Sequence, residues 1–469
     1  PDRMTIEADA DALLSRIWTE LTDEGIAAPI AQSVPLPSRC ATAALAWASV
    51  SAVSLAAESL TANSLIPHAS NTGEVSTSGT PSFACQLDPA RIAVAYTSER
   101  HLRINDQAVD AWSPMSGFFP VADGWVRTHG NYPHHAQAIR RALDLGDNAG
   151  KEELAFALSQ RSMHEARVAI EAEGGLCVAV SPEDPAFDEQ LRRTPLIRTA
   201  RIGDAPARVF APSPDAPLRG IRVLDLTRVI AGPVATRTLA LFGADVLRID
   251  PPALPEPELQ LLDTCHGKRF IQLDLRESAA TLDALLREAD VLVTGYRPSA
   301  IDALGLSPHA IAQRYPGLVV ARLSAWGFGM ADADRRGFDS LVQAASGIAM
   351  VESVDGQTPG VLPAQALDHS AGYLLAAAVM TLLRRQCAEG GTWLAETSLR
   401  RIAAELLGMP RSAEPASLEP VDPLPYMQRF DVDGRIVMTA APALPVNGEW
   451  IDFRAPRPWD VAQAEWLPR

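Results

Sequence analysis

The segment IRVLDLTRVIAGPVATRTLALFGADVLRIDPP, at residues 221–252, decides the fold of this chain. Its pattern of apolar residues predicts a strand, then a helix, then a second strand, as in the first unit of a nucleotide-binding fold. Pro233 suits the first helical position, and Gly243 suits the position just after the helix. The turn before the helix contains only Gly232, whereas the dinucleotide fingerprint needs three glycines so that the backbone can approach a pyrophosphate. The segment therefore predicts a nucleotide-type unit that does not bind NAD or FAD.

Strands and helices continue to alternate beyond this segment, as far as residue 387. Such an alternation is typical of an α/β fold with a mostly parallel, Rossmann-like sheet and helices on both faces. We expect strands at 222–226, 245–249, 270–274, 290–294 and 318–323, and helices at 233–242, 278–288, 308–313, 338–347 and 370–387.

The residues before this core predict a smaller α+β region without repeated strand–helix units. Residues 42–60 predict a long buried helix, and GFFPVADGWVRTHG at 117–130 predicts a β-hairpin with a turn at Asp123-Gly124. We also expect helices at 133–144 and 151–173, a strand at 175–181, and a loop rich in Ser, Thr and Gly at 69–82.

Proline-rich stretches without periodicity divide the chain into parts. We place a linker at 206–217, between a first region at 1–205 and the Rossmann-like domain at 218–410. The remaining residues, 411–469, include FDVDGRIVMTAAP at 430–442, which repeats the features of the first hairpin. This similarity indicates either a partial internal repeat or chance, because hairpins of this kind are common.

Composition excludes several classes of function. The 469 residues carry a formal net charge of −16, so the chain lacks the basic surface that nucleic-acid binding needs. Its five cysteines are scattered, which is typical of reduced thiols in a cytoplasmic protein and not of a disulfide framework or a zinc site. The first residues lack the basic region of a signal peptide, and Glu58 interrupts the most apolar helical stretch, so we expect no membrane span. Because the sequence has no Walker loop and no metal-binding motif, we also expect no metal and no tightly bound cofactor.

Five blocks of sequence, in order between residues 218 and 385, resemble the family III CoA-transferases. This is the carnitine dehydratase and bile-acid-inducible type, and it includes α-methylacyl-CoA racemases. The blocks are LRGIRVLDLTRVIAGPVATRTLALFGADVLRID (218–250), HGKRFIQLDLRE (266–277), ADVLVTGYRPSAIDALGLS (289–307), LSAWGFGMADADRRGFDSLVQAASGI (323–348) and ALDHSAGYLLAAAVMTLLRR (366–385). The resemblance implies a Rossmann-like domain that binds an acyl-CoA, in proteins that form interlocked homodimers. Coenzyme A or acyl-CoA is then the substrate, and a small carboxylic acid is the acceptor.

The resemblance also implies which residues contact coenzyme A. By their positions in the blocks these are Val229, Ala231, Leu273, Arg276, Gly295, Tyr296, Arg297 and Arg336. This agrees with the chemistry of the ligand, since its phosphates need separate cations and its pantetheine arm needs an apolar channel. Lys268 and Arg269 are further cations near expected strand ends, where open α/β sheets bind their ligands.

Asp368 matches the aspartate that acts as the nucleophile in the transferases. The family chemistry implies an aspartyl anhydride, then an aspartyl-CoA thioester, and a net passage of CoA from one acid to another. From the residues alone, an Asp before an apolar helix is more often an N-cap, and the helix N–H groups that favour a capping carboxylate also suit an oxyanion. Asp339 is a second carboxylate in this region, and we expect it to be structural.

Other activities stay open at this stage. Racemases of the family pair the aspartate with a histidine, but the matching residue here is Phe338, which cannot carry a proton. His369 follows Asp368 directly, and neighbours at a helix start point in different directions. An acyl-CoA hydrolase, a racemase and a non-catalytic CoA-binding or scaffold protein remain the alternatives to a transferase.

The chain also departs from the family pattern. The Rossmann blocks begin nearly halfway along the chain, few residues follow Gly408, and the glycine-rich active-site loop of the family has no match. Residues 1–205 instead resemble the small domain and return segment that normally follow the blocks. We therefore interpret the chain as a degenerate tandem, whose first part supplies the small domain that the second part lacks. The donor and acceptor acids are not encoded in these motifs.

Overall fold

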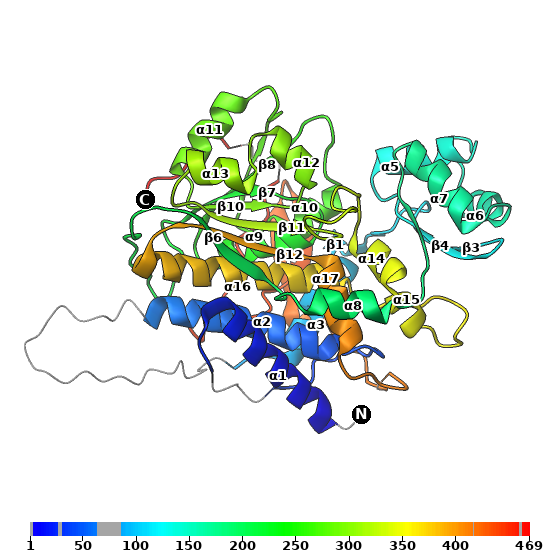
Figure 1. The fold of residues 1–469 in the computed structure, drawn as a ribbon, viewed down its shortest axis with the longest axis horizontal. Helices are drawn as coiled ribbons and strands as arrows, with labels where there is room; N and C mark the ends of the chain where they lie inside the picture. The colour runs from blue at the N-terminus through cyan, green and yellow to red at the C-terminus, as the bar shows by residue number, and fades with distance from the viewer. Residues whose placement is uncertain (1–2, 27–30, 63–85, 416, 459–461) are drawn as a thin grey trace, which may run out of the picture.

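The computed structural model describes residues 3–26, 31–62, 86–415, 417–458 and 462–469 (Figure 1). The loop expected at 69–82 lies outside these residues.

A large sheet forms the centre of the described molecule, with the strand order β6-β12-β11-β10-β7-β8-β9. Neighbouring strands are parallel except β6 and β12, which are antiparallel. The parallel strands are β7 (Arg222–Leu226), β8 (Asp245–Asp250), β9 (Arg269–Gln272), β10 (Val291–Thr294), β11 (Val319–Ser324) and β12 (Thr392–Ser398). The expected α/β fold with a mostly parallel sheet is therefore confirmed, and each of the five expected strands lies within two residues of its observed bounds.

The strands are apolar on both faces because helices cover both faces of the sheet. Val223, Val246, Val291 and Val319 are neighbours in register and belong to one core cluster, whereas the following residue of each strand belongs to the other. Helices α9 (Ala231–Leu241) and α16 (Ala366–Glu389) cover the first face (Figure 1). On the opposite face lie α11 (Ala279–Glu288), α12 (Pro298–Ala303) and α13 (Pro308–Arg314).

Helix α9 ends as expected but begins earlier. Gly243 follows the helix with a positive φ of 101°, which is the left-handed conformation that favours glycine. Pro233 is the third helical residue and not the first, because the helix begins at Ala231.

A further helical layer covers α16 on the side away from the sheet. Helix α2 (Thr42–Ala62) packs along α16, and α1 (Arg3–Thr22) packs along α2 (Figure 1). In the described part of the chain, α2 and α16 are long and apolar enough to cross a membrane, but 94% and 100% of their most apolar stretches are buried inside the protein. Both are therefore core helices of this fold, and the buried helix expected at 42–60 is observed.

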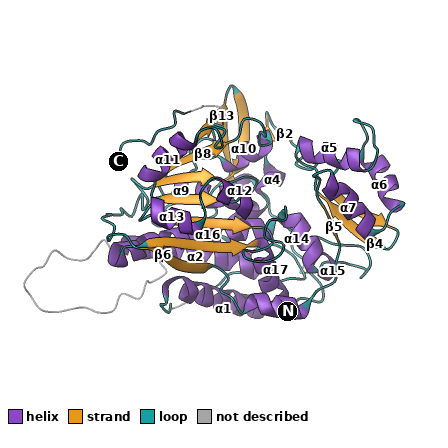
Figure 2. Cartoon of the chain, turned by 45° about the horizontal axis from the view of Figure 1, so that its top comes forward, coloured by secondary structure: helices purple, strands orange, loops and turns teal. Residues whose placement is uncertain are grey.

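A small lobe, residues 115–179, stands beside the main body (Figure 2). Its sheet has the order β3-β4-β5, and its own core cluster runs from Met115 to Cys177. Its elements are β3 (Gly117–Val121), β4 (Gly124–Thr128), α5 (Pro133–Ala142), α6 (Lys151–Ser159), α7 (Met163–Ala172) and β5 (Cys177–Ala179). The single helix expected at 151–173 is wrong, because Ser162 caps a new helix by accepting a hydrogen bond from the backbone N–H of Glu165.

The two hairpins that look alike in sequence lie in different sheets. The turn of the first consists of Ala122 and Asp123, one residue earlier than expected, since Val121 pairs with Gly124. The second hairpin turns at Asp433-Gly434, where both residues have positive φ, and belongs to a sheet of order β13-β14-β1-β2. Its strands are β13 (Met427–Val432), β14 (Arg435–Ala440), β1 (Arg103–Ile104) and β2 (Gln107–Ala108).

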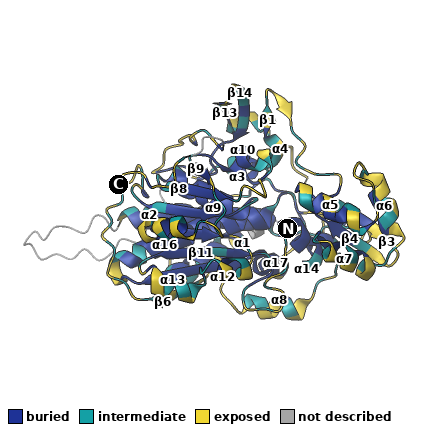
Figure 3. Ribbon diagram, turned by 90° about the horizontal axis from the view of Figure 1, so that it is seen from above, coloured by how far each residue is buried: buried dark blue, intermediate teal, exposed yellow. Residues whose placement is uncertain are grey.

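Segments from both halves of the chain surround the core. Strand β6 (Arg198–Gly203), which precedes the expected linker, is the antiparallel edge of the large sheet. The remaining elements are α3 (Pro89–Tyr96), α4 (Ser98–His101), α8 (Pro185–Arg192), α10 (Glu258–Thr264), α14 (Asp339–Ser346), α15 (Ile348–Val351), α17 (Leu399–Gly408) and the short 3-10 helix Leu424–Tyr426. Burial is greatest in the parallel strands of the large sheet, α2, α9 and α16, while the edge strand β6 is partly exposed and α6 and α8 expose their outer faces (Figure 3).

Candidate active site

A cavity of about 290 Å³ lies where the strand order of the sheet reverses. The chain passes from β7 to β8 on one side and returns to β10 on the other, so the loops after β7 and β10 diverge. Open α/β sheets bind their ligands at this point. The cavity is lined by Val229 and Ala231 after β7, by Gly295, Tyr296 and Arg297 after β10, and by Arg336, Phe338 and Asp368 from later segments.

The loop after β7 is shaped by side chains in place of glycines. The buried Asp225 accepts hydrogen bonds from the backbone N–H and the hydroxyl of Thr227 and from the hydroxyl of Thr236. Val229 has a φ of +69°, a left-handed conformation that is strained for a β-branched residue and that often marks functional sites. A Cβ on Gly232 would lie 2.3 Å from Cβ of Thr227, so this glycine serves close packing and not phosphate binding.

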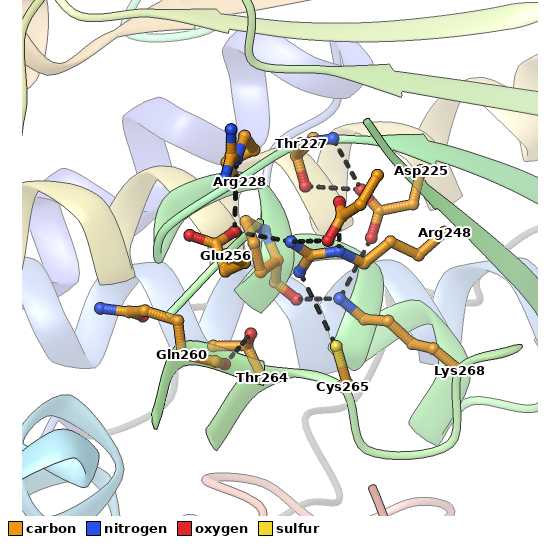
Figure 4. A network of polar contacts seen from close by, with 12 residues as sticks. Asp225, Thr227, Arg228, Arg248, Glu256, Gln260, Thr264, Cys265 and Lys268 are labelled. Carbon is orange, nitrogen blue, oxygen red and sulfur yellow. Dashed lines mark hydrogen bonds and ion pairs between the residues drawn. The ribbon is translucent and has the colours of Figure 1, made fainter. Parts of the chain in front are cut away.

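A buried network of charges supports this loop (Figure 4). The Lys268 ammonium lies 3.1 Å from the Asp225 carboxylate and also donates to the carbonyl of Pro233, with both charged side chains fully buried. Arg248 forms ion pairs with Asp250 and Glu256 in the same interior. These groups neutralise one another beneath the cavity, so they are unavailable to a ligand.

Cations are concentrated at the rim of the cavity. Arg228, Arg297, Arg335 and Arg336 line it. Among the described residues Arg297 has no acidic partner, and Arg336 donates only to the carbonyl of Gly174 in the small lobe. Burial and then the nearby Arg297 lower the pKa of Arg336. An anion between these two side chains would relieve their repulsion.

Asp368 lies in the first turn of α16, on the wall of the cavity. Gln365, not Asp368, is the N-cap residue, and its side chain makes no capping bond. The capping carboxylate is Asp339 from α14, which accepts from the backbone N–H of Asp368 at 2.9 Å and from that of Leu367. Gln343 donates to the other oxygen of Asp339. The expected N-cap role of Asp368 is therefore wrong, and these two helix N–H groups are already occupied by Asp339.

The two carboxyl groups titrate together. Burial, followed by the negative charges of Asp339 and Glu99, raises the pKa of Asp368 well above its usual range. Burial raises the pKa of Asp339 to about 6, although its hydrogen bonds oppose the rise. Because neighbouring buried like charges disfavour double ionisation, the charge on Asp339 makes the Asp368 carboxyl harder to ionise.

The small lobe completes the wall of the cavity opposite the sheet. Tyr132, His134 and His135, from the β4–α5 connection and the start of α5, line the cavity together with Phe338. The Phe338 ring stacks on His129 of the lobe, with 4.2 Å between ring centroids. Tyr132 donates from its hydroxyl to Glu256, which links the lobe to the buried charge network. The first half of the chain therefore contributes side chains to the site.

Most of the site residues expected from sequence come together in this cavity. Asp368, Val229, Ala231, Gly295, Tyr296, Arg297 and Arg336 all line it. Leu273 and Arg276 do not: Leu273 packs against the core on the α11 side of the sheet, and the exposed Arg276 pairs with Asp274. Of the two further cations, Lys268 is buried as described above, and Arg269 pairs with Asp245.

Sequence reasoning missed other residues of the site. Arg228 and Arg335 belong to the same loops as expected contacts, and a search for every cation in the five blocks would have found them. Tyr132, His134 and His135 carried no such signal, because only the tertiary fold brings the small lobe to the cavity.

Two further expectations concern His369 and metals. His369 faces away from Asp368 toward the N-terminal half, where its ring stacks on Tyr96 and its Nε2 lies 3.9 Å from a Glu99 carboxylate oxygen.

In the described part of the chain, no group of three or more His, Cys, Asp or Glu side chains is arranged to hold a metal ion.

Comparison with known proteins finds relatives of the segment that carries most of this site. Residues 218–413 match the family model described as CoA-transferase family III. A probable fatty acyl-CoA transferase of Mycobacterium tuberculosis is 31% identical over 41% of this chain and 53% of its own length. A formyl-CoA:oxalate CoA-transferase of Rhodopseudomonas palustris is 30% identical over 37% of this chain and 44% of its own length.

Solved structures give matches of similar extent. A hypothetical protein of M. tuberculosis is 30% identical with a TM-score of 0.39, over 41% of this chain and 58% of that one. A CAIB/BAIF family protein of Brucella suis is 23% identical with a TM-score of 0.38, over 47% of this chain and 65% of that one. The chain spans about half the length of the curated relatives it matches. The resemblance to family III CoA-transferases is thus confirmed for residues 218–413, the segment that carries Asp368.

Proposed function

We propose that this protein is a CoA-transferase that moves CoA from an acyl-CoA donor to a carboxylic acid acceptor through a covalent intermediate on Asp368. One observation supports this above the others: a buried carboxyl group and a rim of arginines line the same cavity, within the segment that matches the family.

We expect the arginine rim to bind the phosphates of coenzyme A. Arg297 and Arg336 are the cations of the rim without an acidic partner among the described residues, whereas Arg228 also lines the cavity but pairs with Glu256. Separate cations suit a ligand whose phosphates are spread along its length better than a single glycine loop would. The apolar lining of Val229, Ala231 and Leu323 suits the pantetheine arm.

The proposed chemistry balances without a cofactor. The ionised Asp368 carboxylate attacks the thioester carbonyl, and the carbon–sulfur bond breaks. CoA departs as its thiolate, and the acyl group is then joined to Asp368 as an aspartyl–acyl anhydride. The thiolate then attacks the aspartyl carbonyl, which releases the first acid as its carboxylate and leaves an aspartyl-CoA thioester. The acceptor carboxylate repeats the two steps in reverse, so that a new acyl-CoA leaves and the Asp368 carboxylate is restored.

The raised pKa of Asp368 sets a condition on this mechanism. The nucleophile is the carboxylate, so Asp368 must lose its proton before it attacks. The N–H donors at the start of α16 are bonded to Asp339, so oxyanion stabilisation has to come from other groups around the cavity.

The alternatives find less support at this site. A racemase needs two proton-carrying groups at the α-carbon, and Phe338 occupies the position of the second one. A hydrolase would use the same anhydride with water as the acceptor. A scaffold protein would need the cavity and its arginines but no reactive carboxyl group.

The test is a comparison of Asp368→Asn and Asp368→Ala with the unchanged protein. Both variants should lose transfer, by at least about three orders of magnitude, because they remove the covalent route. Both should keep their affinity for CoA, and Asp368→Asn should fold as well as the unchanged protein, since Asp339 does the capping and an amide is cheaper to bury than a carboxylate.

The products should be followed by mass spectrometry with a panel of acyl-CoA donors and acids. Hydroxylamine should label Asp368 only when an acyl-CoA is present, because it attacks anhydrides and thioesters but not free carboxylates. Transfer by the Asp368→Asn protein would refute the covalent role, and CoA binding without any transfer would favour the scaffold.

Two broader expectations belong to the same proposal. We propose that the protein acts in the cytoplasm, given its scattered cysteines, and that it forms a homodimer, as the family resemblance implies.

A further inference from the structure

Glu256 is a buried carboxylate that bonds to separate parts of the molecule (Figure 4). It lies between β8 and α10, its side chain is fully buried, and it is not among the residues that line the cavity of Asp368. Its Oε2 atom lies 2.6 Å from Nη2 of Arg248 on β8 and accepts from the backbone N–H of Val229 at 3.3 Å. Its Oε1 atom accepts from the hydroxyl of Tyr132 in the small lobe. The sheet, the loop after β7 and the lobe therefore meet at one side chain that lies outside the cavity lining.

The bond to Val229 holds the loop after β7 in a conformation that is unfavourable for its own residues. Val229 is β-branched and has a φ of +69°, so contacts around it have to offset the cost of this left-handed backbone. Nε of Arg228, the preceding residue, lies 3.7 Å from Oε2 of Glu256, and its guanidinium lies over the Tyr132 ring, 4.9 Å from the centroid. Arg228 and Val229 both line the cavity. Glu256 thus fixes the shape of a cavity wall that it does not itself form.

The bond to Tyr132 is buried, unlike the ion pair between Arg335 and Glu171, which also joins the main body to the small lobe. The side chains of that pair are 29% and 34% exposed and lie 3.6 Å apart, so the pair holds the lobe weakly. A buried hydrogen bond to a carboxylate is stronger and more directional. Burial, followed by the charge of Glu256, raises the pKa of Tyr132 well above its usual range, so its hydroxyl keeps the proton that it donates.

Arg248 does not depend on Glu256 for a countercharge. Asp250 accepts from Nε and Nη2 of Arg248 at 3.0 and 3.2 Å, so one carboxylate already neutralises the guanidinium. Burying a second carboxylate is costly unless further donors bond to it. The donors that Glu256 gains are those of the loop and the lobe, and these are the two parts that face each other across the cavity.

We propose that Glu256 is a positioning residue, which fixes the small lobe and the loop after β7 relative to each other so that transfer at Asp368 can proceed. This inference rests on the proposed function, because it concerns the rate of that transfer. The rim cations Arg297 and Arg336 belong to other segments of the chain. We therefore expect loss of Glu256 to disturb the reacting groups more than the contacts to the phosphates of coenzyme A.

The test separates kcat from CoA affinity, with the full chain. Glu256→Ala removes every bond described above, and kcat per CoA-binding site should fall at least about tenfold, because small misplacements of reacting groups are costly. The dissociation constant of CoA, measured by calorimetry, should change by less than about threefold, since the rim cations remain. Glu256→Gln supplies an oxygen for Val229 and an amide that can bond to the Tyr132 hydroxyl, so it should recover most of the rate.

Tyr132→Phe isolates the link to the lobe, because it keeps the ring and removes only the hydroxyl. We expect a smaller fall in kcat than in Glu256→Ala. The double variant should be no slower than Glu256→Ala alone, because both changes act through the same bond. Glu171→Gln is the matched control: it changes a glutamate in the more exposed link between lobe and main body, and it should leave kcat unchanged.

A purely structural role for Glu256 predicts a different result. Glu256→Ala would then unfold at a lower temperature but keep the full kcat per CoA-binding site, and this outcome would overturn the inference, as would additive losses in the double variant. If Glu256→Ala does not fold, an unchanged kcat in Tyr132→Phe overturns it equally. Absence of transfer by the unchanged protein with every donor and acid would overturn the proposed function, and this inference with it.

Discussion

Two carboxyl groups meet at the start of α16, with one set of helix N–H donors between them. Asp339 accepts these donors, and Asp368 is left to face the cavity. The helix terminus therefore stabilises the neighbour of the reactive group and not the group itself. The negative charge held on Asp339 then makes Asp368 harder to ionise.

The pH dependence of transfer should report this coupling. The carboxylate of Asp368 is the reactive form and its pKa is raised, so the rate should increase as the pH rises through that pKa. Asp339→Asn removes the neighbouring charge, which should lower the pKa of Asp368 and move the rising limb to lower pH. The profile of kcat against pH, measured for both proteins, tests this shift. The unfolding temperature of each protein shows whether loss of the Asp339 cap at the start of α16 destabilises the variant. If the rising part of the profile stays at the same pH in a stable Asp339→Asn protein, the charge of Asp339 does not raise the pKa of Asp368.

Arg297 and Arg276 form a matched pair for testing the phosphate contacts. Both were expected to bind CoA, but Arg297 lines the cavity and Arg276 lies outside it, bonded to Asp274. Arg297→Gln should weaken CoA binding about tenfold, and Arg276→Gln should leave it unchanged, with little effect of either on stability. Calorimetry at low salt measures the CoA affinity of both variants. A loss that is larger for Arg276→Gln would mean that the ligand lies along the β9 edge of the sheet.

The helices and strands of the second half were largely predictable because their signals are local. Continuous apolar runs place five of the six parallel strands within two residues, and Gly243 marks the end of α9 correctly, but strand β12 was not expected. The errors arise where a tertiary contact or a cap overrides the local pattern. Ser162 interrupts the helix expected at 151–173, and Asp339 takes the capping role expected of Asp368.

Charged side chains illustrate the same limit of prediction from sequence. Lys268 follows the pattern of a phosphate-binding cation, yet its side chain turns inward to pair with Asp225. Sequence shows that a residue is charged and lies near a strand end, but not whether an oppositely charged group is buried beside it. In the same way, no local pattern could show that Tyr132 reaches Glu256.

Lys268→Met should therefore act on stability and not on the ligand. It leaves the Asp225 carboxylate buried without its countercharge, which typically costs about 3–5 kcal/mol. Urea unfolding measures the loss, and CoA affinity should be unchanged in the protein that still folds. Arg193→Met is the control, because it breaks an exposed pair with Glu189 that contributes about 1 kcal/mol or less. Loss of CoA binding with full stability would restore Lys268 as a phosphate contact.

The two halves of the chain share one core and one cavity. Helix α2 of the first half covers the side of α16 that faces away from the sheet, and β6 forms the edge of the sheet itself. The small lobe adds Tyr132, His134 and His135 to the cavity wall. Residues that precede the Rossmann-like blocks therefore form part of the wall of the cavity that those blocks build.

A chain shortened to residues 206–469 tests this dependence. It would expose the apolar face of α16 that α2 buries, and such a large exposed apolar surface favours aggregation or a loosely packed state. We expect it to be insoluble, or to bind a hydrophobic dye and lose near-ultraviolet circular dichroism. We also expect it to lose CoA affinity, because Tyr132, His134 and His135 are missing from the cavity wall. Co-expression with residues 1–205 should restore both solubility and CoA affinity if the two halves dock as they do in the intact chain. A well-folded 206–469 chain with the CoA affinity of the whole protein would show that the second half is autonomous, and that the small lobe contributes nothing to the ligand.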